Sequence, residues 1–368
     1  MPFRLKISLA ILALLVVVIF VVPLFIAPGA PAGVKPLAAV AGSAAQYVEI
    51  DGVSLHVVRQ QPAADPSAEA PLFLLLHGFP FSTATFDDLA PLLADHGEVV
   101  AVDLPGFGLS ERPLDKELQS IERAHDLDPY SPTGQVRLVR GLLAELGADE
   151  VILVGSDSGA RLALDVALAL DAGSDAVSDA GSDAGSDAGG AAAGSIVAND
   201  YRLGGLVLIG ASPYVGSRRS WLARAVMNSP QLEHIGPIFL RQIAQEPGLR
   251  ILRAGWNDPT AIEQEDFDAF QRPWTVEHWD DALWQLTKAE APPSLEGALG
   301  AVTVPALIVA GGEDGVVPTG ESERLATELP NATLQLVPGC GHAVQEECPQ
   351  ELAQLVGAWL SRTSASGR

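Results

Sequence analysis

The fold is decided by the stretch Val151-Ile152-Leu153-Val154-Gly155-Ser156-Asp157-Ser158-Gly159-Ala160. An apolar, β-rich run ends at its first glycine, a polar triplet follows, and a helix-forming run extends from Arg161 to Leu170. This order of strand, sharp turn and helix is typical of a nucleophile elbow, G-x-Nuc-x-G. Glycines flank such a turn because its backbone is crowded on both sides of the nucleophile. The nucleophile position holds Asp157, where most elbows carry serine.

Two more polar residues follow apolar runs later in the chain. Asp314 comes just after the expected strand Val304–Ala310, and His342 comes just after the expected strand Ala332–Val337. The chain order is therefore nucleophile, acid, histidine. In an open parallel sheet, sites form beyond the carboxyl ends of the strands, so we expect these residues to meet Asp157 there.

The end of one other strand could also hold the acid. The run Leu206–Gly210 is followed by Ala211-Ser212-Pro213, which offers no carboxylate. Taken alone, Asp314 could simply be a turn residue. Because the other strand end offers no carboxylate, we favour Asp314 as the acid. His342 could likewise be a packed histidine without a chemical role. Its position after the last strand, next to glycines, favours a catalytic role.

Strand and helix signals alternate through most of the chain. Alternating strands and helices predict a mostly parallel sheet with helices on both faces. The expected strands are Gln46–Ile50, Val53–Gln60, Pro71–Leu76, Glu98–Val102, the elbow strand, Leu206–Gly210 and the two strands before the acid and the histidine. The expected helices run from Ser82 to His96, from Ser131 or Thr133 to Gly147, and over Arg161–Leu170, Pro318–Leu329 and Pro349–Leu360, with 111–130 irregular.

The elbow, the chain order and two loops together resemble the α/β-hydrolase family. The loops are His77-Gly78-Phe79-Pro80 and the glycine-rich run Asp103–Ser110, of the kind that follows the fourth strand in this family. The resemblance covers nearly all of residues 46–361. It implies an α/β-hydrolase fold with an inserted helical cap. It also implies an oxyanion hole made by the backbone N–H groups of Phe79 and Ser158, with a structural role for His77.

The aspartate elbow is similar to those of haloalkane dehalogenases, haloacetate dehalogenases and epoxide hydrolases. Each subfamily differs from this chain at one point. Ser158 stands where haloalkane dehalogenases carry a halide-binding tryptophan, and Tyr214 is the only tyrosine near the cap entrance for the acid of an epoxide hydrolase. Arg161 matches the second of two carboxylate-binding arginines of haloacetate dehalogenases, so we expect it to contact substrate.

Aspartate at the elbow predicts a particular mechanism. A carboxylate is already ionised at neutral pH and can attack an electrophilic sp3 carbon directly, which a serine hydroxyl can do only with a base. The product is an ester of Asp157, which water activated by His342 then hydrolyses while Asp314 orients the imidazole. Two alternatives stay open: a serine-type esterase or weakly active relative that uses Ser156 or Ser158, and a non-catalytic binding protein on the cell surface.

The chain divides into successive parts by composition. Between 213 and 300 tryptophans and prolines appear without a clear strand, which predicts the helical cap. Residues 171–200 hold an acidic low-complexity repeat, read as a disordered surface insertion because glycines and like charges four residues apart disfavour a helix. The expected parts are an anchor (1–27), a linker (28–45), the first part of the hydrolase core (46–212), the cap (213–300), the second part of the core (301–361) and a tail (362–368).

The N-terminal run Ile7–Ala27 is uncharged and apolar apart from Ser8 and Pro23. About 20 apolar residues span a bilayer as a helix. Arg4 and Lys6 precede the run, so the positive-inside rule predicts a single-pass membrane protein with its catalytic domain outside the cytoplasm. A cleaved signal peptide is the alternative, but its apolar core is usually about 7–15 residues long, shorter than this run.

Composition excludes some classes of partner. The 368-residue chain has a formal net charge of −24, which argues against nucleic acid, whose phosphates need basic patches. We expect a small-molecule substrate and the membrane as partners. No metal-ligand spacing is present, and no cofactor is expected. Cys340 and Cys348 are the two cysteines, and the sequence leaves open whether they form a disulfide.

Overall fold

The computed structural model describes residues 29–62, 70–171, 201–214, 216, 219–241, 246–289 and 291–366. The expected anchor, residues 1–27, lies outside these ranges, and so does the acidic insertion apart from its first residue. Within the described residues, no helix combines the length and the hydropathy that crossing a bilayer requires. The structure therefore describes the hydrolase core and the cap.

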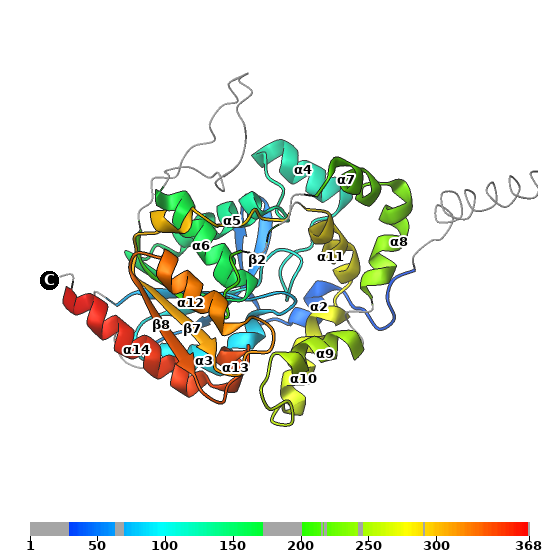
Figure 1. Ribbon diagram of the computed structural model, residues 1–368. Coiled ribbons are helices and arrows are strands. Elements are labelled where there is room, and N and C mark those ends of the chain that lie inside the picture. The colour runs from blue at the N-terminus through cyan, green and yellow to red at the C-terminus, as the bar shows by residue number, and fades with distance from the viewer. Residues whose placement is uncertain are drawn as a thin grey trace, which may run out of the picture.

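A single eight-stranded sheet forms the centre of the molecule (Figure 1). Its spatial order is β1-β2-β4-β3-β5-β6-β7-β8. The β1–β2 and β2–β4 pairs are antiparallel, and every other neighbouring pair is parallel. The strands are β1 (Gln46–Ile50), β2 (Val53–Gln60), β3 (Leu72–Leu76), β4 (Val99–Val102), β5 (Glu150–Ser156), β6 (Arg202–Ile209), β7 (Ala306–Gly311) and β8 (Ala332–Val337). The predicted mostly parallel sheet is confirmed.

Helices cover both faces of this sheet. Successive side chains of a strand point to opposite faces, so the apolar strand β3 feeds two cores. Leu72, Leu74 and Leu76 pack into the core on one face, and Phe73 and Leu75 pack into the core on the other. The first core is closed by α5 (Pro132–Leu146), α6 (Ser158–Asp171) and α12 (Thr319–Glu328), and the second by α3 (Leu89–Leu93), α13 (Val344–Glu347) and α14 (Pro349–Ser366).

The cap inserted between β6 and β7 is helical, as the sequence predicts. It contains α7 (Trp221–Met227), α8 (Pro230–Leu240), α9 (Glu246–Ala254), α10 (Gln264–Gln271) and α11 (Trp279–Lys288), with short 3₁₀ turns η3 (Arg272–Thr275) and η4 (Leu299–Ala301). Figure 1 shows these helices together on one side of the sheet. Aromatic rings fill the inside of the cap, where Trp274 lies edge-on to both Phe270 and Trp279.

Three local expectations are wrong. Residues 115–125, expected to be irregular, form α4 (Asp115–His125), whose buried Ile121 joins the core while most other positions stay polar. The helix expected to begin after Ser82 is instead a 3₁₀ turn, η2 (Thr83–Phe86), followed by α3, because the carboxylate of Asp103 takes the Thr83 N–H at 2.7 Å. The expected tail is also helical over its described residues, since α14 continues to Ser366.

The segment expected to be a linker is attached to the cap. It contains α2 (Leu37–Ala41), and Lys35 forms a parallel bridge with Val276. The Lys35 N–H donates to the carbonyl of Thr275 at 2.8 Å, and Arg272 donates to the carbonyl of Val40 at 3.0 Å. The chain therefore reaches the sheet by way of the cap.

Candidate active site

Asp157 occupies the tip of the turn between β5 and α6. Its φ of 51° lies in the left-handed region, which costs a non-glycine residue about 1–2 kcal/mol. The backbone is held there from both sides: the Asp157 N–H donates to the carbonyl of Ile209 at 2.9 Å, and its carbonyl accepts from the N–H groups of Ala160 and Arg161. The strained elbow predicted from the sequence is thus present.

The two elbow glycines are required by close backbone contacts. A Cβ at Gly155 would lie 2.4 Å from the carbonyl oxygen of Gly159, and a Cβ at Gly159 would lie 2.0 Å from the carbonyl oxygen of Leu76. Both distances are far below van der Waals contact. The helix α6 can therefore begin directly against β3 and β5, which places Asp157 above the end of the sheet.

The structure brings His342 and Asp314 together. His342 Nδ1 lies 2.9 Å from Asp314 Oδ2, and Asp314 Oδ1 accepts the N–H groups of Val316 and Val317, each at 2.8 Å. The Asp314 side chain is fully buried. Burial alone would raise the pKa of Asp314, but the hydrogen bond and charge of His342, with the two backbone N–H groups, hold it below its ordinary value. Asp314 is thus placed as a charged residue that orients the imidazole.

The other ring nitrogen of His342 faces the elbow. His342 Nε2 lies 4.0 Å from Asp157 Oδ1, and the Asp157 side chain is 32% exposed, so solvent reaches the carboxylate. Burial would lower the pKa of His342, but the hydrogen bond and charge of Asp314, and then the charges of Asp157 and Glu346, raise it above its ordinary value. A water molecule held by Nε2 would lie next to the Asp157 carboxyl group.

A disulfide closes the loop that carries His342. Cys340 and Cys348 are bonded, which answers the question that the sequence leaves open. Gly311 packs against the same loop, since a Cβ there would lie 1.9 Å from the carbonyl oxygen of Gly341. The Ala343 N–H donates to the carbonyl of Gly255 in the cap at 2.8 Å. The histidine loop is therefore fixed to the sheet, to α14 and to the cap.

Phe79 and Ser158, the two residues expected to donate to the oxyanion, contact each other next to Asp157. The Phe79 N–H points to Ser158, where it donates to the side-chain Oγ at 2.9 Å. His77, one turn earlier in the loop, is buried; its Nδ1 donates to the carbonyl of Gly78 and its Nε2 accepts from the Leu104 N–H. Burial lowers the pKa of His77. A neutral histidine that joins two loops fits the structural role implied by the resemblance.

The two serines beside Asp157 are engaged elsewhere. The buried Ser156 hydroxyl donates to Gln345 Oε1 at 3.2 Å, and the Ser158 hydroxyl accepts from Phe79. A serine nucleophile needs a hydrogen bond from its hydroxyl to the general base. The donated hydrogen bond of Ser156, and the 4.0 Å distance from Asp157 Oδ1 to His342 Nε2, favour Asp157 as the group that faces His342.

The expected contact between Arg161 and substrate is not supported. Arg161 is buried on α6, where it forms an ion pair with Asp165, Nε to Oδ2, at 3.0 Å. Its terminal nitrogens donate to the carbonyls of Pro213 and Pro293, at the two ends of the cap. All three guanidinium nitrogens thus have protein partners, and the side chain joins α6 to the base of the cap.

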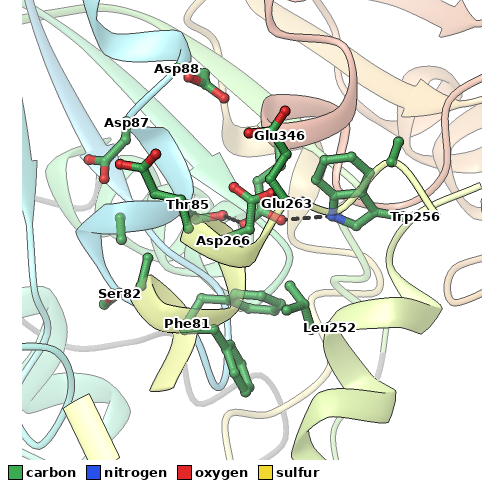
Figure 2. Close-up of a pocket in the computed structure, with 15 residues that line it drawn as sticks. Phe81, Ser82, Thr85, Asp87, Asp88, Leu252, Trp256, Glu263, Asp266 and Glu346 are labelled. Carbon is green, nitrogen blue, oxygen red and sulfur yellow. Dashed lines mark hydrogen bonds between the residues drawn. The ribbon is translucent and has the colours of Figure 1, made fainter. Parts of the chain in front are cut away.

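A cavity of about 390 Å³ lies between the core and the cap, beside the histidine loop (Figure 2). Its lining comes from η2, α9, α10 and α13 and includes neither Asp157 nor His342. Six carboxylates contribute to it: Asp87, Asp88, Glu263, Glu265, Asp266 and Glu346. No signal in the sequence pointed to this cavity, because its acidic residues come from three separate segments.

Glu346 lines this cavity, and its charge also contributes to the raised pKa of His342. Its carboxylate accepts hydrogen bonds from the Thr85 hydroxyl and, at 3.0 Å, from Trp256 Nε1 (Figure 2). Burial raises the pKa of Glu346 to about 7, and burial together with the charge of Asp88 raises the pKa of Asp87 to about 6. These two carboxyl groups are therefore partly protonated near neutral pH. Among the described residues, no group of three or more histidine, cysteine, aspartate or glutamate side chains is placed to hold a metal ion.

A mostly parallel eight-stranded sheet, an inserted helical cap and an elbow that faces a histidine define an α/β hydrolase. The model of the family described as "Alpha/beta hydrolase family" matches residues 73–355, so the chain belongs to that family and is a hydrolase. This confirms the fold and the enzyme class predicted from the sequence.

Three known proteins illustrate the range of similarity. The chain is 24% identical over 311 residues to the uncharacterized hydrolase YugF of Bacillus subtilis (84% of this chain, 96% of the relative). It is 27% identical over 339 residues to epoxide hydrolase A of Mycobacterium tuberculosis (86% and 97%). The structure of haloalkane dehalogenase DbeA from Bradyrhizobium elkani USDA94 superposes with a TM-score of 0.60 at 19% identity (88% and 99%), a likeness of fold.

Proposed function

We propose that this protein is a membrane-anchored hydrolase that cleaves a small organic substrate by way of an ester of Asp157. The observation that carries the proposal is the placement of the Asp157 carboxylate at the elbow, 4.0 Å from His342 Nε2, with Asp314 on the other ring nitrogen. The substrate class is a neutral molecule with an electrophilic sp3 carbon, namely an alkyl halide or an epoxide. The distant similarity to an epoxide hydrolase supports the same class.

In the first step Asp157 is the nucleophile. One carboxylate oxygen attacks the carbon, a C–O bond forms, and the bond to halide or to the epoxide oxygen breaks. The halide leaves as an anion; an epoxide oxygen becomes an alkoxide, which takes a proton from solvent water. No proton has to leave Asp157, because the attacking group is a carboxylate. The acidic cavity beside the site favours neutral substrates over haloacetate-like anions.

In the second step water hydrolyses the ester. His342 takes a proton from the water, whose oxygen attacks the carbonyl carbon of Asp157, and Asp314 holds the imidazole in position. The negative charge develops on an oxygen of Asp157, where the N–H groups of Phe79 and Ser158 would bind it. Losing one such donor typically costs about 2.7–4 kcal/mol. The C–O bond of the ester breaks, the alcohol leaves with the proton from His342, and Asp157 keeps the oxygen of the water.

The membrane part of the proposal comes from the N-terminus. Residues 7–27 are uncharged, apolar and long enough to span a bilayer, with Arg4 and Lys6 before them. By the positive-inside rule this arrangement predicts a catalytic domain outside the cytoplasm, with secretion after signal cleavage as the alternative. The Cys340–Cys348 disulfide supports an oxidising compartment.

An oxygen-labelling experiment tests the ester. After a screen of alkyl halides, epoxides and short esters has identified a substrate, excess enzyme is mixed with it in 18O-water for one turnover. We expect the peptide that contains Asp157 to gain 2 Da and the product alcohol to carry no label. Label in the alcohol and none in the peptide would mean that water attacks the substrate directly, and the proposal would be abandoned.

A further inference from the structure

The outer edge of the cap exposes large apolar side chains. On α7, Trp221 is 75% exposed, Leu222 57% and Val226 51%, and no residue of this helix is buried. Phe239 on the neighbouring helix α8 is 65% exposed. We call these four residues the outer cap face. These exposed side chains lie on two helices that contact each other, and exposed apolar residues gathered in one region of a domain are typical of a surface that binds a partner or a membrane.

The stretch of sequence that contains the outer cap face is rich in basic residues, although the whole chain is acidic. The full chain carries 46 acidic and 22 basic residues, yet the stretch 213–241 contains four arginines and a single acidic residue, Glu233. That glutamate is paired with Lys288 and accepts a hydrogen bond from Trp284. Arg241 is likewise paired with Asp280, and Arg219 donates to the carbonyls of Lys288 and Ala289. Arg224 lies on α7, three residues after the exposed Trp221. A basic and an exposed aromatic side chain on the same helix match an anionic lipid surface.

The N-terminal segment reaches the molecule at this same edge. Arg241, at the end of α8, donates to the carbonyl of Gly29, the first described residue, at 2.6 Å. Figure 1 shows the blue N-terminal segment running up to the end of α8. The apolar run of the sequence ends only two residues earlier, at Ala27, and two extended residues span about 7 Å at most. If 7–27 crosses a bilayer, the end of α8 must lie close to the lipid surface.

We propose that the outer cap face docks onto the anionic surface of the bilayer, with its aromatic and aliphatic side chains at the level of the lipid headgroups. The inference rests on the anchor in the proposed function and adds an orientation to it. The anchor alone would tether the domain at one point. The cap helices supply a second contact, which holds α7 and α8 against the membrane and the sheet away from it.

The test uses the full chain with one introduced cysteine. Both native cysteines are in the disulfide, so Leu222→Cys or Phe239→Cys is the only thiol for an environment-sensitive fluorophore. Leu336→Cys is the matched control, because Leu336 is another exposed leucine (43%) but lies on β8, the far edge strand of the sheet. The labelled proteins are reconstituted into vesicles of phosphatidylcholine and phosphatidylglycerol that contain a nitroxide lipid.

We expect the nitroxide lipid to quench labels at 222 and 239 several-fold more than the label at 336. The difference should shrink in vesicles of phosphatidylcholine alone and in high salt. If the chain floats with the vesicles and all three labels are equally unquenched, docking is wrong and the anchor stands. A label at 222 that shifts in emission without lipid quenching indicates a protein partner, such as a second copy, and also overturns docking. If the chain does not float with the vesicles, both the docking and the membrane anchor are refuted. Neither result affects the proposal that the protein is a hydrolase acting through Asp157.

Discussion

Replacing His342 by glutamine should separate the two chemical steps. Glutamine has similar length and can hydrogen-bond, but its amide cannot take a proton from water. His342 Nε2 lies 4.0 Å from Asp157 Oδ1, close enough for one water to contact both at about 2.8 Å. Attack on the substrate needs Asp157 alone, so its ester should form. The ester should then persist, because its hydrolysis has lost the base.

The expected size of the effect follows from the role assigned to the imidazole. General base catalysis contributes about 10²–10⁴-fold, which corresponds to about 3–5.5 kcal/mol on the barrier of the second step. His342→Gln should therefore release one equivalent of leaving group rapidly and then turn over 10²–10⁴-fold more slowly than the native enzyme. Intact-protein mass spectrometry should show one added alkyl group, and the peptide carrying it should contain Asp157.

Two controls make the result specific. His96→Gln makes the same chemical change at an exposed histidine and should turn over normally without an adduct. The double variant Asp157→Asn, His342→Gln should release no leaving group and gain no mass. If His342→Gln turns over at the native rate, or stalls with no adduct and no burst, the two-step assignment is refuted.

Three other predictions concern the groups around the histidine. Gly210→Ala puts a Cβ 2.7 Å from His342 Cε1 at a residue with φ of +56°, so a displaced ring should slow ester decay by about 100-fold in single turnover while leaving-group release continues. Ser158→Ala removes the acceptor of the Phe79 N–H and leaves this donor free for the oxyanion. Since a hydrogen bond contributes about 0.5–1.5 kcal/mol, ester decay should accelerate about 2- to 10-fold. Slower decay would show that the Ser158 hydroxyl assists the reaction. Only neutral His342 accepts a proton, so the rate of ester decay should fall as the pH drops through a pKa above the ordinary 6.5. Asp314→Asn should move the midpoint of this pH profile downward. An unmoved midpoint would exclude an effect of Asp314 on the pKa of His342.

Much of the core could be read from local sequence. A strand buried on both faces, such as β3, must be apolar at every position, and it appears as an uninterrupted run in the sequence. The turn at Asp51-Gly52 is similarly local, since both residues adopt positive φ between β1 and β2. The elbow is also predictable from local sequence. Its glycines are required by close contacts within one strand–turn–helix unit and with the adjacent strand.

Other features depended on residues far apart in the chain. The 3₁₀ turn η2 begins where it does because Asp103, 20 residues later, takes the Thr83 N–H. Helix α4 was missed because it is mostly polar and is stabilised by packing of residues such as Ile121. Arg161 could be assigned to substrate from its neighbours in sequence, but Pro213 and Pro293 decide its actual partners.

The amino-acid sequence by itself determined the hydrolase fold and the cap. It also determined which three residues lie at the ends of β5, β7 and β8, because strand ends and turns produce local sequence patterns. Tertiary structure decided how these residues are paired: the 2.9 Å contact of His342 with Asp314, the N–H of Phe79 held by Ser158, and the disulfide around the histidine loop. It also placed Gly29 at the end of α8, next to the outer cap face. The disulfide joins cysteines eight residues apart, but the other contacts join residues from 28 to 212 positions apart. No local pattern of residues encodes a distance across the fold.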